Sequence, residues 1–383
     1  MKFYYITNSR LPTEKAFGYG ITKMCEAFGR SGRNVELILP KRFGADPKTI
    51  FSYYGVEPTF SIRILWALDL FRFERYLGKF AYGIHAVTFF ISLCFLKVKK
   101  GDWLYSRDLF LLPLLRLKSP SVFLEIHFLQ TTQRRLRFFF RYAKKILVTT
   151  TYLQKEIATY GFPSDQILVI HDAVDISQFG ILVDKIEARQ KLALPTDKQL
   201  IVYTGNFKAM GQDKGILNVL KALPYVLKKQ SNIMFVAVGG TASDISEYKK
   251  LSEKFGVAEY VSFLPRVHVR ELPLYQSAAD ALAMCPPNTE YYAHHVSPLK
   301  MFEYMASSRP IIASDLPSMR EVLDESSAFL VNADDEIKLS QMILNALENQ
   351  VMAKKLSTNA RRVVEEYTWE KRAARALGFL KLN

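Results

Sequence analysis

The segment 297–306, Ser-Pro-Leu-Lys-Met-Phe-Glu-Tyr-Met-Ala, combines a helix start with charged side chains at helical spacing. Ser297 is expected to be the N-cap and Pro298 the first helical residue. The unpaired N–H groups and positive dipole end of such a helix suit a diphosphate. Glu303, one turn in and on the same side as Lys300, could accept hydrogen bonds from two ribose hydroxyls. The alternative is a capped surface helix with an i,i+3 Lys–Glu pair.

A second segment could cradle phosphate oxygens where a strand gives way to a loop. Gly205 and Asn206 follow an apolar run, and Lys214 precedes a glycine that opens the next helix. Gly205 would let the backbone approach a ligand closely. Lys214 would supply a point charge for phosphate oxygens. The alternative is a solvated lysine before a turn glycine.

Two segments of the first half could also face a ligand. His127 follows the apolar run 122–126, and the carboxyl end of a parallel strand is where ligands bind. It could hydrogen-bond a sugar hydroxyl, or be a satisfied structural histidine. Near the N-terminus, Ala16 and Gly18 are small residues that would admit a ligand to the backbone, although Lys23 breaks the Gly-x-Gly-x-x-Gly fingerprint.

The elements that must position these residues alternate between strands and helices along the whole chain. Many strands are near-continuous apolar runs, as in parallel sheets buried on both faces. We predict strands at 3–6, 35–39, 103–105, 122–126, 146–150, 167–170, 200–203, 233–238, 261–264, 281–284, 311–313 and 329–331. This pattern predicts an α/β protein of two doubly wound, Rossmann-like domains that face each other across a cleft.

The domain boundaries are predicted from composition and turn signals. Residues 1–180 would form an acceptor-binding domain, and the polar stretch 181–199, with its Pro195-Thr196-Asp197 turn, would form a linker. Residues 200–365 would bind the nucleotide, and 366–383 would form a C-terminal helix that packs back on the first domain.

Charge and composition narrow the partners. The formal net charge of +15, from 52 Lys and Arg against 37 Asp and Glu, favours anionic partners. Nucleic acid is not expected, because no zinc-finger, basic-region or RNA-binding signature is present. The three dispersed cysteines fit a reducing compartment, and no leader is recognisable, so a cytoplasmic protein is predicted. No metal-type cluster is evident, and no cofactor or metal is expected.

One hydrophobic stretch, 84–96, is shorter than the ~20 residues of a membrane-spanning helix. It predicts a buried helix. The alternative is peripheral contact with the inner face of a membrane, through aromatic side chains at the headgroups and basic ones on anionic lipid: Phe89, Phe90, Phe95, Lys97, Lys99 and Lys100.

Taken together, the ordered segments resemble glycosyltransferase family 4, whose members are retaining enzymes of the GT-B fold. The resemblance covers nearly the whole chain and is carried by Glu125-Ile126-His127, Val174-Asp175 with Phe179, Tyr203-Thr204-Gly205, Lys214-Gly215, Val238-Gly239-Gly240, 271–275, 297–306 and 309–317. It implies a nucleotide-sugar donor held mainly by the second domain.

The resemblance also implies roles for single residues. Glu303 matches the glutamate that holds the donor ribose, Lys214 the diphosphate-binding lysine, and His127 a sugar-contacting histidine. Backbone N–H groups near Leu299 and Lys300 would meet the diphosphate or base.

Three positions depart from the family pattern. His295 stands eight residues before Glu303, where the family has its first glutamate; Asn206 stands where Arg is frequent; and Lys15-Ala16 replaces a glycine pair.

The sequence therefore predicts a metal-independent, retaining transferase that moves a sugar from a nucleotide-sugar to an acceptor hydroxyl. A lipid-linked or glycan acceptor in cell-envelope or surface polysaccharide or glycolipid synthesis would fit the aromatic and basic first half. Two alternatives stay open: a nucleotide-sugar epimerase of the same fold, and a non-catalytic nucleotide-sugar- or glycan-binding subunit.

Overall fold

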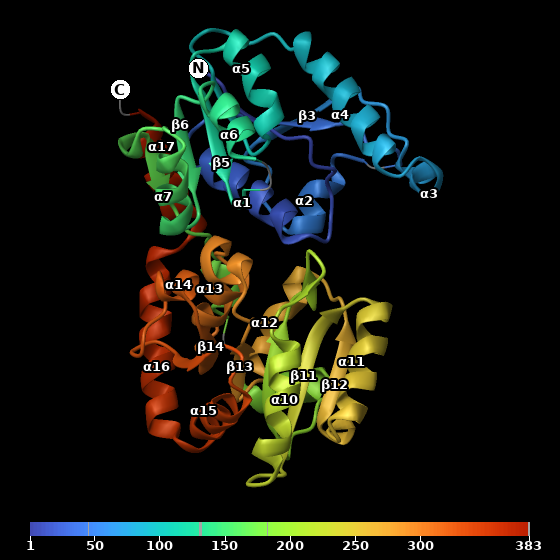
Figure 1. Cartoon of the computed structure of the whole chain (residues 1–383), viewed down its shortest axis with the longest axis vertical. Coiled ribbons are helices and arrows are strands. Elements are labelled where there is room, and N and C mark those ends of the chain that lie inside the picture. Colours follow the sequence, from blue (N-terminus) through green and yellow to red (C-terminus); the bar gives the residue numbers. More distant parts are fainter. Residues whose placement is uncertain (45, 130–131, 182, 382–383) are drawn as a thin grey trace. The chain divides into compact units, whose positions relative to one another are not determined.

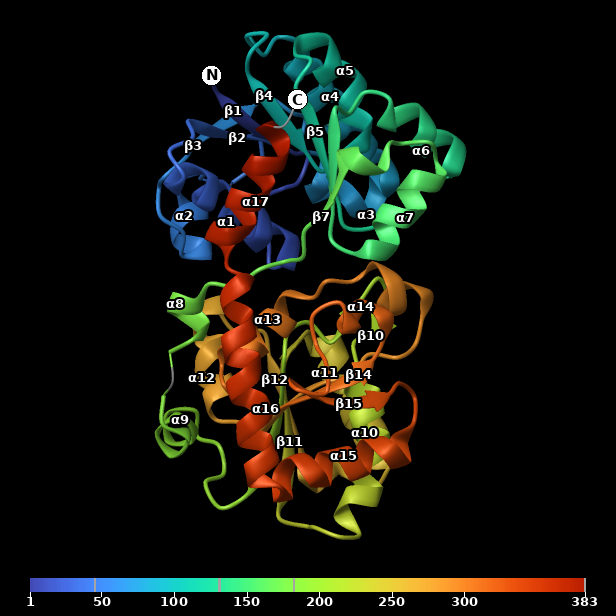
Figure 2. The same ribbon diagram turned by 90° about the vertical axis from the view of Figure 1, so that its left-hand side faces the viewer.

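The structure, a computed structural model, describes residues 1–44, 46–129, 132–181 and 183–381. The chain divides into two compact units, each built around its own sheet (Figure 1). Unit 1 comprises Met1–His171 together with the segment that starts at Trp369, and unit 2 comprises Asp172–Thr368. The C-terminal segment thus belongs with the start of the chain (Figure 2).

Unit 1 contains a seven-stranded parallel sheet in the order β3-β2-β1-β4-β5-β6-β7. Its strands are β1 (Phe3–Ile6), β2 (Val35–Pro40), β3 (Ser61–Leu65), β4 (Trp103–Ser106), β5 (Val122–Ile126), β6 (Lys145–Val148) and β7 (Ile167–Val169). Every residue of β1, β2, β4, β5 and β6 is buried, because helices cover both faces of the sheet.

The helices of unit 1 come from both ends of the chain. They are α1 (Ala16–Arg30), α2 (Thr49–Tyr54), α3 (Glu74–Leu77), α4 (Lys79–Cys94), α5 (Leu112–Lys118), α6 (Gln133–Phe140), α7 (Thr151–Thr159) and α17 (Trp369–Lys381). The last helix, α17, lies against α1 (Figure 2), where the rings of Tyr19 and Trp369 meet edge to face at 6.2 Å.

Unit 2 contains a six-stranded parallel sheet in the order β12-β11-β8-β13-β14-β15. Its strands are β8 (Gln199–Thr204), β11 (Ile233–Gly240), β12 (Val261–Pro265), β13 (Ala281–Met284), β14 (Ile311–Asp315) and β15 (Phe329–Asn332), and a separate hairpin consists of β9 (Lys208–Ala209) and β10 (Gln212–Asp213). The two sheets confirm the predicted pair of doubly wound, Rossmann-like units.

The helices of unit 2 pack on both faces of its sheet. They are α8 (Ile176–Phe179), α9 (Lys185–Lys191), α10 (Ile216–Leu227), α11 (Ala242–Lys254), α12 (Leu272–Ser277), α13 (Leu299–Ala306), α14 (Pro317–Arg320), α15 (Glu336–Glu348) and α16 (Gln350–Val363). Alternate residues of β8 pack into hydrophobic clusters on opposite faces of the sheet. Ile201 and Tyr203 belong to one cluster, and Leu200 and Val202 belong to the other.

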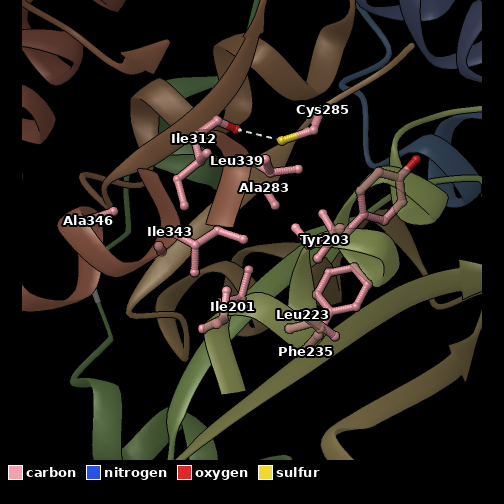
Figure 3. Close-up of a cluster of buried hydrophobic side chains, with 14 of the residues drawn as sticks. Ile201, Tyr203, Leu223, Phe235, Ala283, Cys285, Ile312, Leu339, Ile343 and Ala346 are labelled. Carbon is pink, nitrogen blue, oxygen red and sulfur yellow. Dashed lines mark hydrogen bonds between the residues drawn. The ribbon is translucent and has the colours of Figure 1, made fainter. Parts of the chain in front are cut away.

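Figure 3 shows part of the first cluster, in which Ile201, Ile343 and Leu339 are fully or almost fully buried. Tyr203 lies at the side of this cluster with its hydroxyl directed away from the aliphatic side chains. The end of β8 is therefore where the apolar core gives way to polar groups.

The division between the units lies earlier than the predicted boundary at 180. The Asp172 N–H donates to Ser297 Oγ at 3.0 Å, within unit 2. The predicted linker 181–199 contains α9, whose Arg189 side chain donates to the Ala278 carbonyl at 2.9 Å. This stretch is thus part of unit 2, with Leu182 lying outside the described residues. The sequence could not show this, because the contacts join residues far apart in the chain.

At the other end, the change of unit falls between Thr368 and Trp369 rather than at 366. Residues 364–366 form a short 3-10 turn that stays with unit 2, and 382–383 lie outside the described residues.

Two further differences concern the first half. Strand β3 was not predicted, because its alternating, partly exposed residues at the sheet edge lack a continuous apolar run. The hydrophobic stretch 84–96 falls in and just after α4, but the prediction that it is buried is wrong for one face of that helix. Phe89 is fully buried, whereas Phe95 is 80% exposed.

Candidate functional site

The topology of unit 2 marks one end of its sheet as a binding position. β8 and β13 are neighbours in the sheet. The next sheet strand after β8 is β11, toward one edge, and the next strand after β13 is β14, toward the other edge. Such a switch point leaves a crevice at the carboxyl ends of the two strands. Gly205 directly follows β8, and Cys285 directly follows β13.

Close packing at this point requires glycines. Gly239 has φ +121°, and a Cβ there would lie 2.4 Å from the Gly205 carbonyl oxygen. Gly205 has φ +120°, and a Cβ there would lie 3.3 Å from Lys300 Nζ. The left-handed conformation excludes most side chains at both positions. Because Gly205 has no side chain, the backbone at the end of β8 is uncovered and there is room for the Lys300 ammonium.

Lys300 is a charged residue of unit 2 whose side chain is buried. The residue is 8% exposed, and its Nζ has no hydrogen-bond partner among the residues that the structure describes. The ammonium lies 3.5 Å from the centroid of the Tyr203 ring, a cation–π contact. Burial and the nearby charge of Lys214 hold the pKa of Lys300 well below its usual range. A ligand with negative charge would stabilise the protonated form.

Lys214 is held by the hairpin that follows β8. Its N–H donates to the Phe207 carbonyl at 3.1 Å, and the preceding Asp213 carboxylate accepts the Gly215 N–H at 2.6 Å. Burial lowers the pKa of Lys214, and the charge of Glu303 opposes that change. Gly215 has φ +106°, and a Cβ there would lie 2.4 Å from the Cys285 carbonyl carbon, so this loop is pressed against the end of β13.

Glu303 is 8% exposed on α13. Burial raises its pKa to about 7, although the charges of Lys300 and Lys214 oppose the change. Its Oε2 accepts a long hydrogen bond of 3.5 Å from Gln276 Nε2, which also donates to Thr204 Oγ1 at 3.3 Å. Within the described residues, no ion pair joins Glu303 to either lysine. The sequence alternative of a surface Lys–Glu pair is therefore wrong.

The start of α13 differs from the prediction. Pro298 is the N-cap residue in extended conformation, and Ser297 makes no cap; its Oγ accepts the Asp172 N–H instead. Met301 N–H donates to the Pro298 carbonyl at 2.9 Å. The first N–H groups of α13, at Leu299 and Lys300, are thus not taken by a capping side chain.

The structure also locates two of the positions that depart from the pattern of the resembled family. His295 ends a π-helical turn, Tyr291–His295, and is 7% exposed. Asn206 follows Gly205, and its carbonyl accepts the Tyr203 hydroxyl at 2.7 Å. Gly205, Asn206, Lys214, Lys300 and Glu303 therefore lie at one end of the unit 2 sheet.

In unit 1, His127 stands at the carboxyl end of β5 beside a buried carboxylate. Glu125 Oε1 lies 2.6 Å from His127 Nε2, 2.7 Å from Arg107 Nη2 and 2.8 Å from Arg372 Nη2. Tyr105 donates its hydroxyl to Glu125 Oε2. Burial alone would raise the pKa of Glu125, but Arg107 and Arg372 overcome it and hold that pKa well below its usual range.

The predicted N-terminal loop has another purpose in the structure. A Cβ on Gly18 would lie 2.2 Å from the Tyr54 hydroxyl, which itself accepts the Thr13 N–H at 2.7 Å. A side chain at Gly18, within α1, would collide with Tyr54, so packing accounts for a glycine at this position. Ala16 is the exposed first residue of α1.

The sequence interpretation missed several members of these clusters. The sequence interpretation gave Lys300 a role through its backbone N–H and placed its side chain with Glu303 on the face away from the core, although α13 is buried from Lys300 to Ala306. Glu125 could have been noticed as the one charge in the apolar run 122–126. Arg107 and Arg372 carry no such signal, because only the fold brings α17 to the end of β5.

Across the parts of the chain that the structure describes, no group of three or more His, Cys, Asp or Glu side chains is arranged to hold a metal ion.

Sequence comparison finds a family model that matches most of unit 2 but less than half of the chain. Residues 184–363 match the family model described as Glycosyl transferases group 1. A D-inositol 3-phosphate glycosyltransferase of Xylanimonas cellulosilytica is 26% identical over 243 residues, which are 61% of this chain and 56% of that protein. A phosphatidyl-myo-inositol mannosyltransferase of Mycobacterium leprae is 28% identical over 200 residues, 52% of this chain and 50% of that protein. The chain thus spans little more than half the length of these relatives.

Solved structures agree with the chain over nearly its whole length. Anabaena Alr3699/HepE in complex with UDP and glucose superimposes with a TM-score of 0.72 at 16% identity, covering 99% of each chain. The sucrose-phosphate synthase of Thermosynechococcus elongatus gives a TM-score of 0.70 at 18% identity, covering 99% of this chain and 98% of the other. The fold of the chain is GT-B, as the sequence resemblance implies.

Proposed function

We propose that this protein is a glycosyltransferase whose unit 2 binds a nucleotide-sugar. One observation carries the proposal: at the switch point of the sheet lies a buried lysine ammonium, Lys300, that has no hydrogen-bond partner in the described parts of the chain. The match of residues 184–363 to the group 1 model and the UDP and UDP-glucose complexes of a protein of the same fold support it.

The chemistry of a nucleoside diphosphate fits the groups that meet here. Its two phosphates would face Lys300 and Lys214, which supply two positive charges, and the N–H groups at the start of α13. Glu303 would accept hydrogen bonds from the ribose hydroxyls, and the charge brought by the phosphates would be balanced by the lysines. Gly205 and Asn206 would line the strand end, with His295, Ser297, Pro298 and Leu299 on the other side of the donor.

The proposed reaction is the transfer of the sugar with retention. The bond between the anomeric carbon and the diphosphate oxygen breaks, and a bond to the acceptor oxygen forms on the same face. The acceptor hydroxyl proton passes to the departing phosphate oxygen. Lys214 and Lys300 would stabilise the negative charge that grows on the leaving diphosphate, and no metal ion has a role in this scheme.

Unit 1 would supply the acceptor side. His127 would hydrogen-bond a sugar hydroxyl, with its ring held by Glu125. The proposed acceptor is lipid-linked or a glycan, in the synthesis of cell-envelope or surface polysaccharide or glycolipid, and the proposed site of action is the cytoplasmic face of a membrane.

The test is a thermal-shift screen of the full chain against UDP-, GDP- and ADP-sugars, with K300M and the surface control K338M. Binding raises apparent stability by about 2.7 kcal/mol at a ligand concentration of 100 Kd, so the preferred nucleotide gives the largest shift. We expect K338M to keep that shift, because Lys338 is an exposed residue paired with Asp335 at 3.2 Å. A wild-type chain that no nucleotide stabilises would refute the proposal.

Activity assays then separate the alternatives. Donor hydrolysis without an acceptor indicates a transferase, conversion of the donor into its epimer indicates an epimerase, and binding without turnover indicates a non-catalytic subunit. K214A should reduce turnover more than donor binding, because charge develops on the diphosphate only in the transition state. Equal losses in both would contradict that role.

A further inference from the structure

Exposed apolar side chains concentrate in one short part of unit 1. Among the described residues, 22 large hydrophobic side chains are exposed, and ten of them lie between residues 66 and 95. They are Trp66, Leu68, Phe73, Tyr76, Phe80, Tyr82, Ile84, Val87, Ile91 and Phe95. Single exposed apolar residues are ordinary, whereas a contiguous set marks an interaction surface.

Helix α4 carries two apolar faces. The inward face consists of Ala81, His85, Phe89 and Leu93, all 0% exposed. The outward face consists of five exposed residues in a 4-3-4-4 spacing, which keeps them on one side of a helix: Phe80, Ile84, Val87, Ile91 and Phe95. A helix that needed only to cover the core would have polar residues on this second face.

Hydrogen bonds fix which face of α4 points outward. Thr88 Oγ1 accepts the Leu68 N–H at 2.9 Å, and Ser92 Oγ donates to the Trp66 carbonyl at 2.6 Å. At the end of the helix, Lys118 Nζ donates to the Cys94 and Leu96 carbonyls at 2.8 and 2.9 Å. The helix therefore cannot rotate its outward stripe into the core without losing these bonds.

The charges that flank this helix are mainly positive. Residues 80–96 include no Asp, Glu, Lys or Arg. Over the wider range 70–101 there is one acidic residue, Glu74, against six basic ones: Arg72, Arg75, Lys79, Lys97, Lys99 and Lys100. An apolar stripe with basic residues at both ends complements a surface that is apolar inside and negatively charged outside.

The length of the helix limits how it can meet a bilayer. α4 has 16 residues, and no helix in the described parts of the chain is long and apolar enough to span a membrane. We propose that the outward face of α4, with Lys79 and the lysines at 97–100, binds the surface of an anionic lipid bilayer, with the helix lying in the plane of the headgroups.

This inference does not rest on the proposed transferase activity. It concerns a surface of unit 1 made by α4 and its flanks, and vesicle binding needs no nucleotide-sugar. Failure of donor binding and failure of lipid binding are therefore separate results.

The first test is sedimentation of the full chain with vesicles of phosphatidylcholine alone or mixed with phosphatidylglycerol. The wild-type chain is expected to bind the anionic vesicles. The double variant V87E/I91E is expected to bind them at least about tenfold more weakly, because its two new negative charges would enter the headgroup region. The matched control is V351E on α16, where Val351 is 84% exposed. It should bind like the wild type.

The second test changes only charge. The triple variant K97E/K99E/K100E should lose about tenfold or more in binding to anionic vesicles at low salt. Added salt should weaken the wild-type chain in the same direction. Circular dichroism and melting curves of all variants check that unit 1 remains folded, which is expected because every substituted side chain is exposed.

Trp66 provides a direct optical signal. It is 57% exposed, whereas Trp103 and Trp369 are 8% and 2% exposed, and the chain has three tryptophans in all. Anionic vesicles should shift its emission to the blue, and brominated lipid should quench it. The W66F variant should show neither change while still sedimenting.

Three results would overturn the inference. One is a wild-type chain that stays in the supernatant with anionic vesicles. Another is V87E/I91E sedimenting as well as the wild type. The third is a wild-type dimer in the absence of lipid, seen by analytical ultracentrifugation, together with a monomeric V87E/I91E variant. The stripe would then be an interface between copies of this chain.

Discussion

Each unit contains a buried glutamate beside two cationic side chains, yet the two carboxyl groups behave in opposite ways. In unit 1, Glu125 is 1% exposed and has its pKa held well below the usual range. In unit 2, Glu303 is 8% exposed and has its pKa raised to about 7. Burial by itself would raise the pKa of both carboxyl groups, so contact with the cations decides whether the pKa is raised or lowered.

The contacts differ in kind. Two guanidinium groups approach Glu125 at 2.7 and 2.8 Å and donate hydrogen bonds, which outweigh desolvation. The ammonium groups of Lys300 and Lys214 make no ion pair with Glu303 within the described residues, so desolvation prevails. The unit 1 cluster is complete as it stands, whereas the unit 2 cluster is left with a buried cation. This difference is why the anion site is proposed in unit 2.

The largest expected effect comes from breaking the complete cluster. E125Q should destabilise unit 1 by about 3–5 kcal/mol, because it leaves the buried guanidinium groups of Arg107 and Arg372 without their carboxylate. Urea denaturation measures this, with E187Q as the control, since Glu187 belongs to an exposed pair with Lys191 and should change stability by less than about 0.5 kcal/mol. If E125Q and E187Q both change the free energy of unfolding by similarly small amounts, the Glu125 cluster does not stabilise unit 1.

The next effect comes from removing the unpartnered cation. K300M should weaken binding of the preferred nucleoside diphosphate about a hundredfold, or ~3 kcal/mol, because a buried charge–phosphate contact is lost. The same variant should stabilise the ligand-free chain by about 1–2 kcal/mol, since an isolated buried charge is replaced by an apolar side chain of similar size.

Calorimetry in buffers of different ionisation enthalpy sharpens this test. An anion raises the lowered pKa of Lys300, so the wild-type chain should take up protons on binding and K300M fewer. A K300M variant that binds as tightly as the wild type would remove the main argument for the anion site.

The two glutamates should also give opposite pH dependences. Because the folded-state pKa of Glu303 is raised to about 7, its contribution to stability is fully present below pH ~4.5 and is lost as pH rises through 7. Glu125 contributes stability above its unfolded-state pKa, and that contribution is lost as pH falls through its lowered pKa.

Between pH 5 and pH 8 the wild-type chain should therefore lose about 2.5 kcal/mol of stability through Glu303, and E303Q should not show this loss. Unfolding free energies of wild type and variant at these two pH values measure it. An unchanged difference between the two pH values would show that Glu303 is ionised normally in the ligand-free chain.

The smallest stability effect is expected at the edge of the complete cluster. The His127 side chain is 32% exposed and lies beside Glu125, which also meets the Arg107 and Arg372 guanidinium groups, so H127A should cost less than about 1 kcal/mol. If unit 1 binds the acceptor, the same variant should raise the KM for the acceptor, measured by steady-state kinetics. A large loss of stability would instead assign His127 a structural role.

The sequence by itself determined most of the fold. Apolar runs of strand length alternate with helical patterns, and this local signal predicts parallel strands because such strands are buried on both faces. It failed at β3, whose edge position leaves every residue at least partly exposed, and at α9, whose place in unit 2 depends on contacts with Ala278 and Asp280.

The sequence also determined which residue types stand at the strand ends: Gly205, Lys214, Glu303 and His127. Only the tertiary structure decided which charges have partners. Arg372 reaches Glu125 from 247 residues further along the chain, and Lys300 loses its solvent because α13 is buried on nearly all sides. The physical reason is that the pKa and pairing of a charge depend on desolvation and on distances of a few ångströms between segments remote in sequence, and local spacing carries neither.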